Sequence, residues 1–393
     1  MSTTTGSGKS QLPDTAQAVR AAYQAAMERL EGPADVGLVF APPVHPFETV
    51  QRAMQACSPS TRWLACQSGG GFDERGFARD ALVIFLVRST RARFHDAIAA
   101  DVRADPSAAA ATLCAGFSDQ AKAARDAGLP LSTTLALVDG LAGVGEPLVK
   151  ELRARTRTFQ QIVGGASADD GAFKETPVAN AERVEPRGAV VVHAFDRIGW
   201  GIGVDHGLVP ATPRLTATKT RGTTIVELNG APAFEAYRRF AASKGVTLEP
   251  GSAQRFLIAH ELGVYFLNQL AHVRAPIFVG PNGELEMIAQ VAEGSEVCIL
   301  EAEPDRLLGA ATIAANEAKK SLGAHPVSGV LVFDCICRRM LLGRRFPDEV
   351  EAIRGVFPGV PLAGFVTYGE VARFSGRLDG WHNATTVVVA IPA

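Results

Sequence analysis

The feature that most constrains the fold of this chain is a pattern of strand, helix, strand, glycine turn and strand that occurs three times. The first copy occupies residues 36–87, the second residues 133–195 and the third residues 329–391. Order and spacing recur together, as they do when one supersecondary unit is repeated within a chain. We therefore expect three weakly similar units whose glycine turns stand at strand ends.

The three turns carry the polar residues of these units. They occupy residues 66–71, 164–170 and 364–370, each after a short apolar run. In the third turn, two glycines stand on either side of a threonine and a tyrosine, and a glutamate follows the second glycine. Glycine permits sharp turns and the close approach of a ligand. Polar residues on a turn that leaves a strand are typical of binding sites, so the third turn is the first candidate.

Charge and cysteine usage exclude several classes of protein. A net charge of −2 over 393 residues gives no reason to expect nucleic acid or an anionic membrane as a partner. Six cysteines in so long a chain are not a disulfide framework. The N-terminus lacks the apolar stretch of a signal peptide, and the longest apolar runs have strand length. We expect a cytoplasmic setting.

Length and local composition indicate two domains after a tail. Residues 1–14 are rich in serine, threonine and glycine, which predicts a disordered tail. A chain of 393 residues exceeds the size at which one core keeps growing. Short β-branched runs over residues 189–228 end at an Asn-Gly turn, which places the boundary near residue 230. We expect domains at 15–230 and 231–393.

The fold class follows from the alternation of strands and helices. Several neighbouring strands are close enough to form hairpins, which favours mixed or antiparallel sheets over a parallel doubly wound sheet. No glycine-rich dinucleotide fingerprint occurs between a strand and a helix. We predict an α+β fold with mixed or antiparallel sheets inside and helices outside.

Several motifs resemble those of FIST proteins, which carry FIST N-terminal and C-terminal domains in tandem. The C-terminal part contains F-x-C-x-x-R at residues 333–338, G-F-x-x-Y-G-E at 364–370 and H-N-x-T at 382–385. The N-terminal part contains G-G-A-S-A-D-D at 164–170 and N-G-A-P-A at 229–233. The resemblance extends from about residue 35 to the end of the chain.

Two positions depart from the family pattern. Residues 65–71 read A-C-Q-S-G-G-G where the family tends to have G-C-S-x-A-G-E, so the first turn lacks its carboxylate. Cys337 stands where the family often has glycine.

The resemblance implies a sensory protein of signal transduction that binds a small ligand. Amino acids are one ligand class proposed for the family. Stand-alone members are described as haem-binding nitric-oxide sensors that regulate a partner histidine kinase, and this chain resembles that arrangement. The resemblance therefore implies haem b as a cofactor, a kinase or other signalling protein as a partner, and possible homodimers.

The candidate site residues come from the C-terminal motifs. His382 is the first candidate for an axial haem ligand, since neutral imidazole is the commonest metal ligand, and the Cys335 thiolate or Tyr368 is the fallback. Arg338 has the geometry to pair with a carboxylate or a haem propionate. The predicted ligand-binding residues are Arg338, Thr367, Tyr368, Glu370, His382 and Asn383, with His382 and Cys335 as metal ligands.

Each candidate also has a structural interpretation. Cys335 and Cys337 alternate along an extended segment and face one side if that segment is a regular strand, where cysteine often acts as a small buried hydrophobe. Arg338 is as well suited to a structural ion pair, for example with Glu370. His45, His193, His206 and His272 have no paired context and are interpreted as ordinary.

Three functions are compatible with the sequence. The first is a ligand-binding sensor, with or without haem. The second is a thiol-dependent enzyme that uses Cys335 with His382, although no complete catalytic constellation is present, so we do not expect an enzyme. The third is an interaction scaffold.

Overall fold

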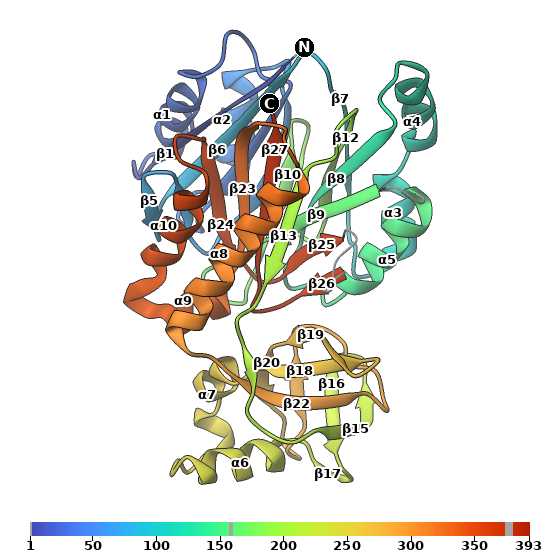
Figure 1. Cartoon of the computed structure of the whole chain (residues 1–393), viewed down its shortest axis with the longest axis vertical. Helices are drawn as coiled ribbons and strands as arrows, with labels where there is room; N and C mark the ends of the chain where they lie inside the picture. The colour runs from blue at the N-terminus through green and yellow to red at the C-terminus, as the bar shows by residue number, and fades with distance from the viewer. Residues whose placement is uncertain (1, 157–159, 374–379) are drawn as a thin grey trace.

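The computed structural model describes residues 2–156, 160–373 and 380–393. Figure 1 shows a large body of three sheets and a smaller part below it, joined by two stretches of chain. We call the smaller part the β-insert, residues 209–301, because the chain enters it from one strand of the body and returns from it into another element of the body. The predicted α+β class, with mixed and antiparallel sheets, is confirmed.

Each of the three body sheets has six strands. The first sheet has the order β1 (Thr3–Ser10), β6 (Leu82–Ser89), β2 (Val36–Ala41), β3 (Arg62–Gln67), β10 (Val178–Asn180) and β11 (Val184–Glu185). The second has β7 (Arg93–Ala99), β12 (Ala189–Asp196), β8 (Leu131–Val138), β9 (Gln160–Ala166), β25 (Glu370–Arg373) and β26 (Gly380–His382). The third has β13 (Gly201–Asp205), β27 (Thr386–Pro392), β23 (Val327–Cys335), β24 (Leu362–Thr367), β4 (Gly71–Asp73) and β5 (Gly76–Ala78).

The predicted repeat is visible in the strand pairing. In each sheet the opening strand of a unit pairs in parallel with the next strand and antiparallel with the last. This holds for β2 with β3 and β6, for β8 with β9 and β12, and for β23 with β24 and β27. The helix between the two parallel strands is the crossover that a parallel pair requires.

The three units exchange hairpins. The hairpin β4–β5, which follows the first turn, adds to β24 of the third sheet. The hairpin β25–β26, after the third turn, adds to β9 of the second sheet, and β10–β11, after the second turn, adds to β3 of the first. Because every unit extends a neighbour's sheet, the three turns lie together at one end of the body.

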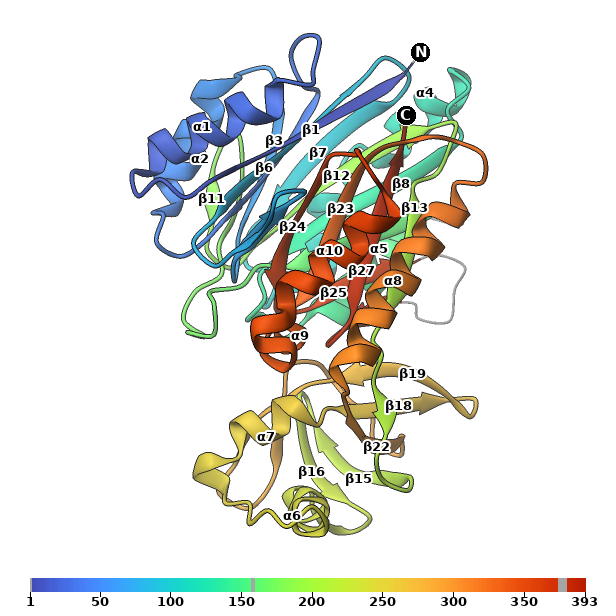
Figure 2. The same ribbon diagram turned by 60° about the vertical axis from the view of Figure 1, so that its left-hand side comes forward.

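Helices cover the outer faces of the sheets (Figures 1 and 2). Around the body they are α1 (Thr15–Met27), α2 (Phe47–Cys57), α3 (Pro106–Leu113), α4 (Phe117–Asp126), α5 (Gly145–Thr156), α8 (Pro304–Ser321), α9 (Ile336–Leu342) and α10 (Phe346–Val356). The inner faces of all three sheets form one apolar core, in which Phe40 stacks on Phe365 at 4.5 Å between ring centroids. Sheets inside and helices outside follow from burying one apolar face of each element.

Residues 3–10, expected to be disordered, form β1 at the edge of the first sheet. The reason lies in the two glycines of this strand. A Cβ atom at Gly6 would stand 1.9 Å from the carbonyl oxygen of Ala26, and one at Gly8 2.0 Å from that of Ala22. Helix α1 therefore packs directly on the strand backbone. The small residues of this segment, which are typical of disordered chains, here allow α1 to pack closely on β1.

Two of the predicted glycine turns begin later than expected. Gly164 and Gly165 lie within β9, and Gly364 lies within β24. The turns themselves start at Ser167 and Tyr368, where the polar residues begin. The glycines serve close packing within the sheets, since a Cβ at Gly364 would stand 2.3 Å from the Phe72 ring.

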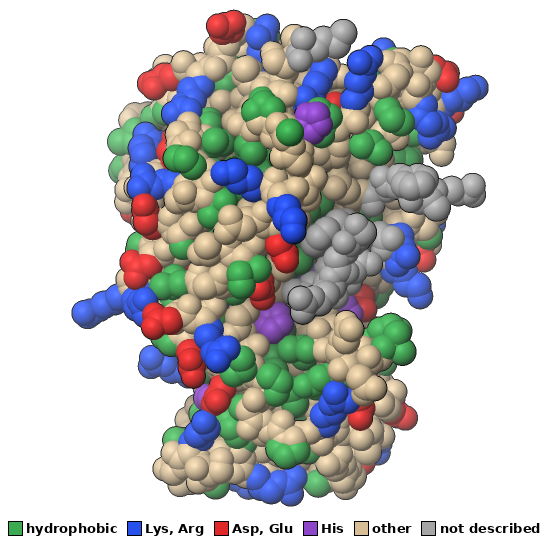
Figure 3. Space-filling model, viewed as in Figure 1, with side chains coloured by type: hydrophobic (Ala, Val, Ile, Leu, Met, Phe, Trp, Pro, Cys, Tyr) green, Lys and Arg blue, Asp and Glu red, His purple; other side chains and the backbone are tan. Residues whose placement is uncertain are grey.

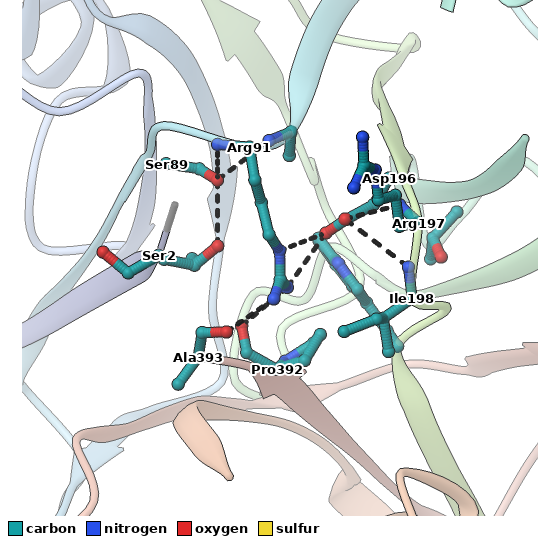
Figure 4. Close-up of polar contacts among 12 residues, drawn as sticks. Ser2, Ser89, Arg91, Asp196, Arg197, Ile198, Pro392 and Ala393 are labelled. Carbon is teal, nitrogen blue, oxygen red and sulfur yellow. Dashed lines mark hydrogen bonds and ion pairs between the residues drawn. The ribbon is translucent and has the colours of Figure 1, made fainter. Parts of the chain in front are cut away.

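Arg91 joins the ends of the three closing strands at the opposite end of the body (Figure 4). It follows β6, and its guanidinium pairs with Asp196 at the end of β12 at 3.0 Å. The same guanidinium donates to the carbonyl oxygens of Pro392, at 3.0 Å, and Ala393 at the end of β27. One side chain thus links all three units.

We expect Arg91→Ala to lower the free energy of unfolding by about 2 kcal/mol, because a mostly buried Asp196 carboxylate loses its charged partner. Chemical denaturation monitored by circular dichroism measures the change. Arg93→Ala, at an exposed neighbouring position, is the control and should change stability by less than about 0.5 kcal/mol. Equal effects of the two substitutions would contradict the assignment.

The β-insert is one nine-stranded sheet with two helices. Its elements are β14 (Val209–Pro210), β15 (Leu215–Arg221), β16 (Thr224–Leu228), β17 (Ala231–Pro232), α6 (Phe234–Ser243), α7 (Gln254–Ala259), β18 (Leu262–Phe266), β19 (Gln269–Arg274), β20 (Pro276–Val279), β21 (Leu285–Met287) and β22 (Glu296–Glu301). Residue 230, the predicted boundary, lies in the turn between β16 and β17. The division at 230 stays a prediction.

Among the described residues, no helix combines the length and the apolar character needed to cross a membrane.

Candidate ligand site between the body and the β-insert

The candidate site is built where β23 and β24 end side by side. The two strands are parallel, so their carboxyl ends open at the same edge of the sheet, which is where α/β sheets commonly bind ligands. Thr367 at the end of β24 donates from Oγ1 to the carbonyl oxygen of Asp334, at 3.2 Å, and to Glu370. Fully buried polar groups therefore line the edge of the third sheet that faces the β-insert.

Glu370 is the central group of this edge. Its carboxyl accepts from the backbone N–H of Thr385 at 3.2 Å and from the Thr385 hydroxyl at 2.7 Å. The thiol of Cys335 lies beside it as well. Burial raises the pKa of Glu370 to about 7, while its hydrogen bonds to the two threonines act in the opposite direction. At neutral pH this carboxyl is therefore poised between its two protonation states.

His382 faces the same space as Glu370. The two residues are direct cross-strand partners in β25 and β26, so their side chains lie on one face of the sheet. The His382 ring is fully buried, and its contact with the backbone of Ala372 does not have the geometry of a full hydrogen bond. Burial, reinforced by the nearby His272, lowers its pKa well below the usual range. His382 is thus a neutral imidazole with unused capacity.

Arg338 is held entirely by the fold. Its guanidinium donates to Glu349, at 2.8 Å from Nε, and pairs with Asp334 at 3.4 Å. The remaining donors reach the carbonyl oxygens of His206, Ala384 and Leu307 at 2.8, 3.4 and 2.8 Å. The structural ion pair weighed for Arg338 exists, with Glu349 and Asp334 in place of Glu370. No donor of this guanidinium is left for a ligand.

Tyr368 and Asn383 stand at the border of the site. The Tyr368 hydroxyl donates to Asp169 of the second turn and accepts from the N–H of Gly171 at 2.7 Å. Its ring stacks on Phe173 at 5.0 Å. Asn383 donates to the carbonyl oxygen of Tyr368 at 3.3 Å. Tyr368 therefore joins two turns, and its side chain is engaged away from Glu370.

Cys335 and Cys337 do not alternate along one strand. Cys335 ends β23, whereas Cys337 lies in the first turn of α9. The prediction of a shared strand face is wrong, because the chain turns into a helix between them. Burial raises the pKa of Cys335 to about 11. The pKa of Cys337 is raised as well, chiefly by its hydrogen bond with Cys335. Both remain protonated thiols, which does not favour a thiolate nucleophile or ligand.

The β-insert contributes groups that the sequence did not single out. Glu261, the residue before β18, is 1% exposed, and among the described residues only the weak thiol donor of Cys337 lies beside its carboxyl. Burial raises its pKa to about 8, and the Cys337 thiol beside it lowers the pKa in part. His272 of β19 lies 5.7 Å from the His382 ring, and burial lowers its pKa to about 4.

Arg274 fastens the β-insert to the body. It donates to the carbonyl oxygen of Trp381 at 2.9 Å and pairs with Glu146 of α5 at 2.7 Å. The next residue, Ala275, donates its N–H to Asn383 at 3.5 Å. Figure 3 shows the molecule narrowing at this junction, with hydrophobic side chains gathered on the β-insert just below it. The junction is closed and mostly buried.

The raised carboxyl pKa values predict a dependence of stability on pH. The folded protein keeps protons on Glu261 and Glu370 that the unfolded chain loses near pH 4.5, so stability falls as pH rises from there to about 8. Asp334 and Glu349 are shifted in the same direction. The buried histidines act oppositely, but only below pH 6.5, above which they are neutral in both states.

We expect the free energy of unfolding to fall by about 1–2 kcal/mol between pH 6.5 and 8.5. Urea denaturation at several pH values measures the slope. Glu261→Gln should flatten it, whereas Glu249→Gln, at an exposed position of the β-insert, should not. Stability that does not change over this range would show that these carboxyls are ionised in the folded protein.

The fit of a haem group at His382 is mixed. The unpaired imidazole nitrogens suit an axial ligand. However, three hollows on the described surface are lined by α1 and α2, by α3, α4 and α5, and by α10 with its neighbours, and none of these three reaches His382. Arg338, the expected propionate partner, has no free donor. The residues offer a ligand atom, but the fully buried ring and the engaged guanidinium do not favour a haem group here.

The structure thus separates the predicted site residues into groups. Cys335, Thr367, Glu370 and His382 gather at one buried edge, Arg338 adjoins it through Asp334, and Tyr368 points elsewhere. Glu261, His272 and Asp334 were missed, and His272, taken as ordinary, faces His382. The signal for Asp334 was a single carboxylate inside an otherwise apolar run. Whether these residues bind a ligand stays a prediction.

Comparison with protein families gives two matches along the chain. The FIST N domain matches residues 35–231, and the FIST C domain matches residues 233–373. A search of curated proteins finds no match. The two matches together cover most of the residues that build the body and the β-insert.

Proposed function

The chain belongs to the FIST family, and on that premise we propose that it senses a small ligand bound between its body and its β-insert. FIST domains are associated with signal transduction and small-ligand sensing. The proposal adds the place of binding. The observation that carries it is the concentration of unpaired polar atoms at the closed junction.

Unpaired buried polar groups are rare in folded proteins because each costs about 1–3 kcal/mol. At this junction Glu261, Asp334, His272 and His382 all have polar atoms without a hydrogen bond among the described residues. They come from the β-insert and from two body sheets. A site that gathers such atoms from separate elements supports a bound molecule that supplies their partners.

The connections between the two parts support a sensing role. Residues 206–208 lead into the β-insert and residues 302–303 lead back, so a ligand between the parts biases how closely they associate. Gly207 in the first connection has φ +70°, which is favourable only for glycine. A partner protein that contacts both the body and the β-insert responds to the change in how closely they associate. A kinase as that partner, a homodimer and a cytoplasmic setting remain part of the proposal.

A ligand panel tests the proposal. Thermal unfolding is measured with the twenty amino acids, haemin and small amines, for the wild type and for Glu261→Gln and His382→Gln. A compound that raises Tm in the wild type should lose most of that shift in both variants and keep it in Glu249→Gln. A stabilising compound that is indifferent to both junction variants would place the ligand elsewhere and overturn the proposal.

A second candidate is a haem-based sensor of nitric oxide with His382 as the axial ligand. The unpaired nitrogens of His382 favour it, and haem would supply the iron that binds the gas. Haemin titration followed by absorption spectroscopy tests this candidate. It predicts a Soret band that changes in His382→Ala. An unchanged spectrum in that variant, or no uptake of haem by the wild type, would remove it.

A further inference from the structure

We propose that the junction binds a small organic cation, with one or two ammonium groups and no carboxylate. The inference rests on the proposed function and names the chemical class of its ligand. It follows from which atoms at the junction lack partners and which do not.

The unpaired atoms are mainly hydrogen-bond acceptors. Among the described residues, the carboxyl of Glu261 has only the weak thiol donor of Cys337 beside it. The carboxyl of Asp334 lies beside the Thr386 hydroxyl and 3.4 Å from the Arg338 guanidinium, and neither contact has the geometry of a full hydrogen bond. The neutral rings of His272 and His382 each carry one acceptor nitrogen and one N–H donor. A ligand that satisfies the two carboxyls must bring N–H donors.

The donors that would hold an anionic ligand are already engaged. Arg338 donates to Glu349 and to three backbone carbonyls. Arg274 is bound by Glu146 and by the carbonyl oxygens of Val273, Trp381 and Gln290. Both guanidinium groups are 2% exposed or less. A carboxylate on the ligand would therefore meet acceptors and neutral groups, which is why a free amino acid does not suit this site.

The charges of the cluster point the same way. Four buried carboxyls, those of Glu261, Asp334, Glu349 and Glu370, lie around one guanidinium, that of Arg338, which pairs directly with Glu349 and Asp334. Two carboxylates near a single cation leave the others without a counter-charge, and a buried unpaired charge is costly. An ammonium group at the junction supplies the missing positive charge.

The location of the groups defines how the ligand enters. Glu261 comes from the β-insert, whereas Glu370 and His382 come from the hairpin β25–β26 of the body. All three side chains are 1% exposed or less, so entry requires the β-insert to move away from the body.

Four probes with one carbon skeleton test the proposal. They are n-butylamine, 1,4-diaminobutane, 4-aminobutanoate and butanoate, each titrated by calorimetry into the full chain at pH 7. We expect one or both amines to bind at least tenfold more tightly than 4-aminobutanoate, and butanoate not to bind.

Variants locate the binding. Glu261→Gln, which keeps the shape of the side chain, should weaken amine binding at least tenfold, and Glu249→Gln should leave it unchanged. Circular dichroism shows whether the Glu261→Gln protein folds. Amine binding to Glu370→Gln tests the contribution of the body to the same site. Failure of both amines to bind at 10 mM, equal binding of 4-aminobutanoate, or unchanged affinity in both junction variants would overturn the proposal.

The outcome also separates this inference from the proposed function. If amines fail while another compound stabilises the protein through Glu261 and His382, only the ligand class is wrong. If no compound acts through these residues, the junction is not a ligand site.

Discussion

Replacing Arg338 by methionine is expected to lower the free energy of unfolding by about 3–5 kcal/mol, since breaking a buried ion pair leaves an uncompensated charge. Arg338 is fully buried and is the only cation in contact with Glu349 and Asp334 among the described residues. Its removal also frees three backbone carbonyls at the junction. Denaturant unfolding monitored by tryptophan fluorescence measures the loss.

The adjacent Arg339 provides the control. It is 16% exposed and pairs with Asp170, and it donates to the carbonyl oxygen of Gly69 at 3.0 Å. We expect Arg339→Met to cost about 1 kcal/mol, as is usual for a partly exposed pair. The double variant Arg338→Met with Glu349→Gln should recover part of the lost stability. Similar losses for Arg338→Met and Arg339→Met would contradict the structural role of the buried guanidinium.

Gly164→Ala is expected to prevent folding or to lower the free energy of unfolding by more than about 4 kcal/mol. Gly164 lies in β9 with φ +152°, and a Cβ there would stand 1.8 Å from the carbonyl oxygen of Ala136 in β8. The clash involves backbone in a parallel pair, so no rotamer change relieves it. The same strand receives the hairpin β25–β26, so the candidate site would be lost as well. Soluble expression and circular dichroism provide the measurement.

A second glycine makes the matched comparison. Gly309 lies in α8, and a Cβ there meets nothing within 4 Å. Gly309→Ala should therefore leave stability unchanged or raise it by up to about 1 kcal/mol. A folded Gly164→Ala protein of normal stability would mean that β8 and β9 do not pair as described.

The repeat was predictable because it rests on local patterns. Each unit combines an apolar strand, an amphipathic helix and a turn, and these periodicities are visible in any window of the chain. The exchange of hairpins was not predictable, because the strands β4–β5, β10–β11 and β25–β26 are short and their partners lie far away in sequence. β1 was missed for a related reason: its glycines matter only through the helix that packs on them.

The site was only partly visible in the sequence. Cys335, Thr367, Glu370 and His382 belong to motifs, and they gather at one edge as their positions after core strands indicate. Arg338 is in a motif too, yet its partner Glu349 lies in α10, and nothing local indicates that pairing. Glu261 and His272 reach the junction through the docking of the β-insert, which is a tertiary event with no local signature. Burial, and with it the raised carboxyl pKa values, could therefore not be foreseen.

Hydrogen–deuterium exchange of the wild-type chain, with and without the panel compound that raises Tm most, tests the central claim directly. If a small ligand binds between the body and the β-insert, peptides covering residues 257–275 and 380–386 should exchange more slowly with ligand, because their backbone lies on the two sides of the junction. Peptides covering residues 15–57, on the far face of the first sheet, should exchange at the same rate. Slower exchange confined to other regions, with the junction unaffected, would contradict the account.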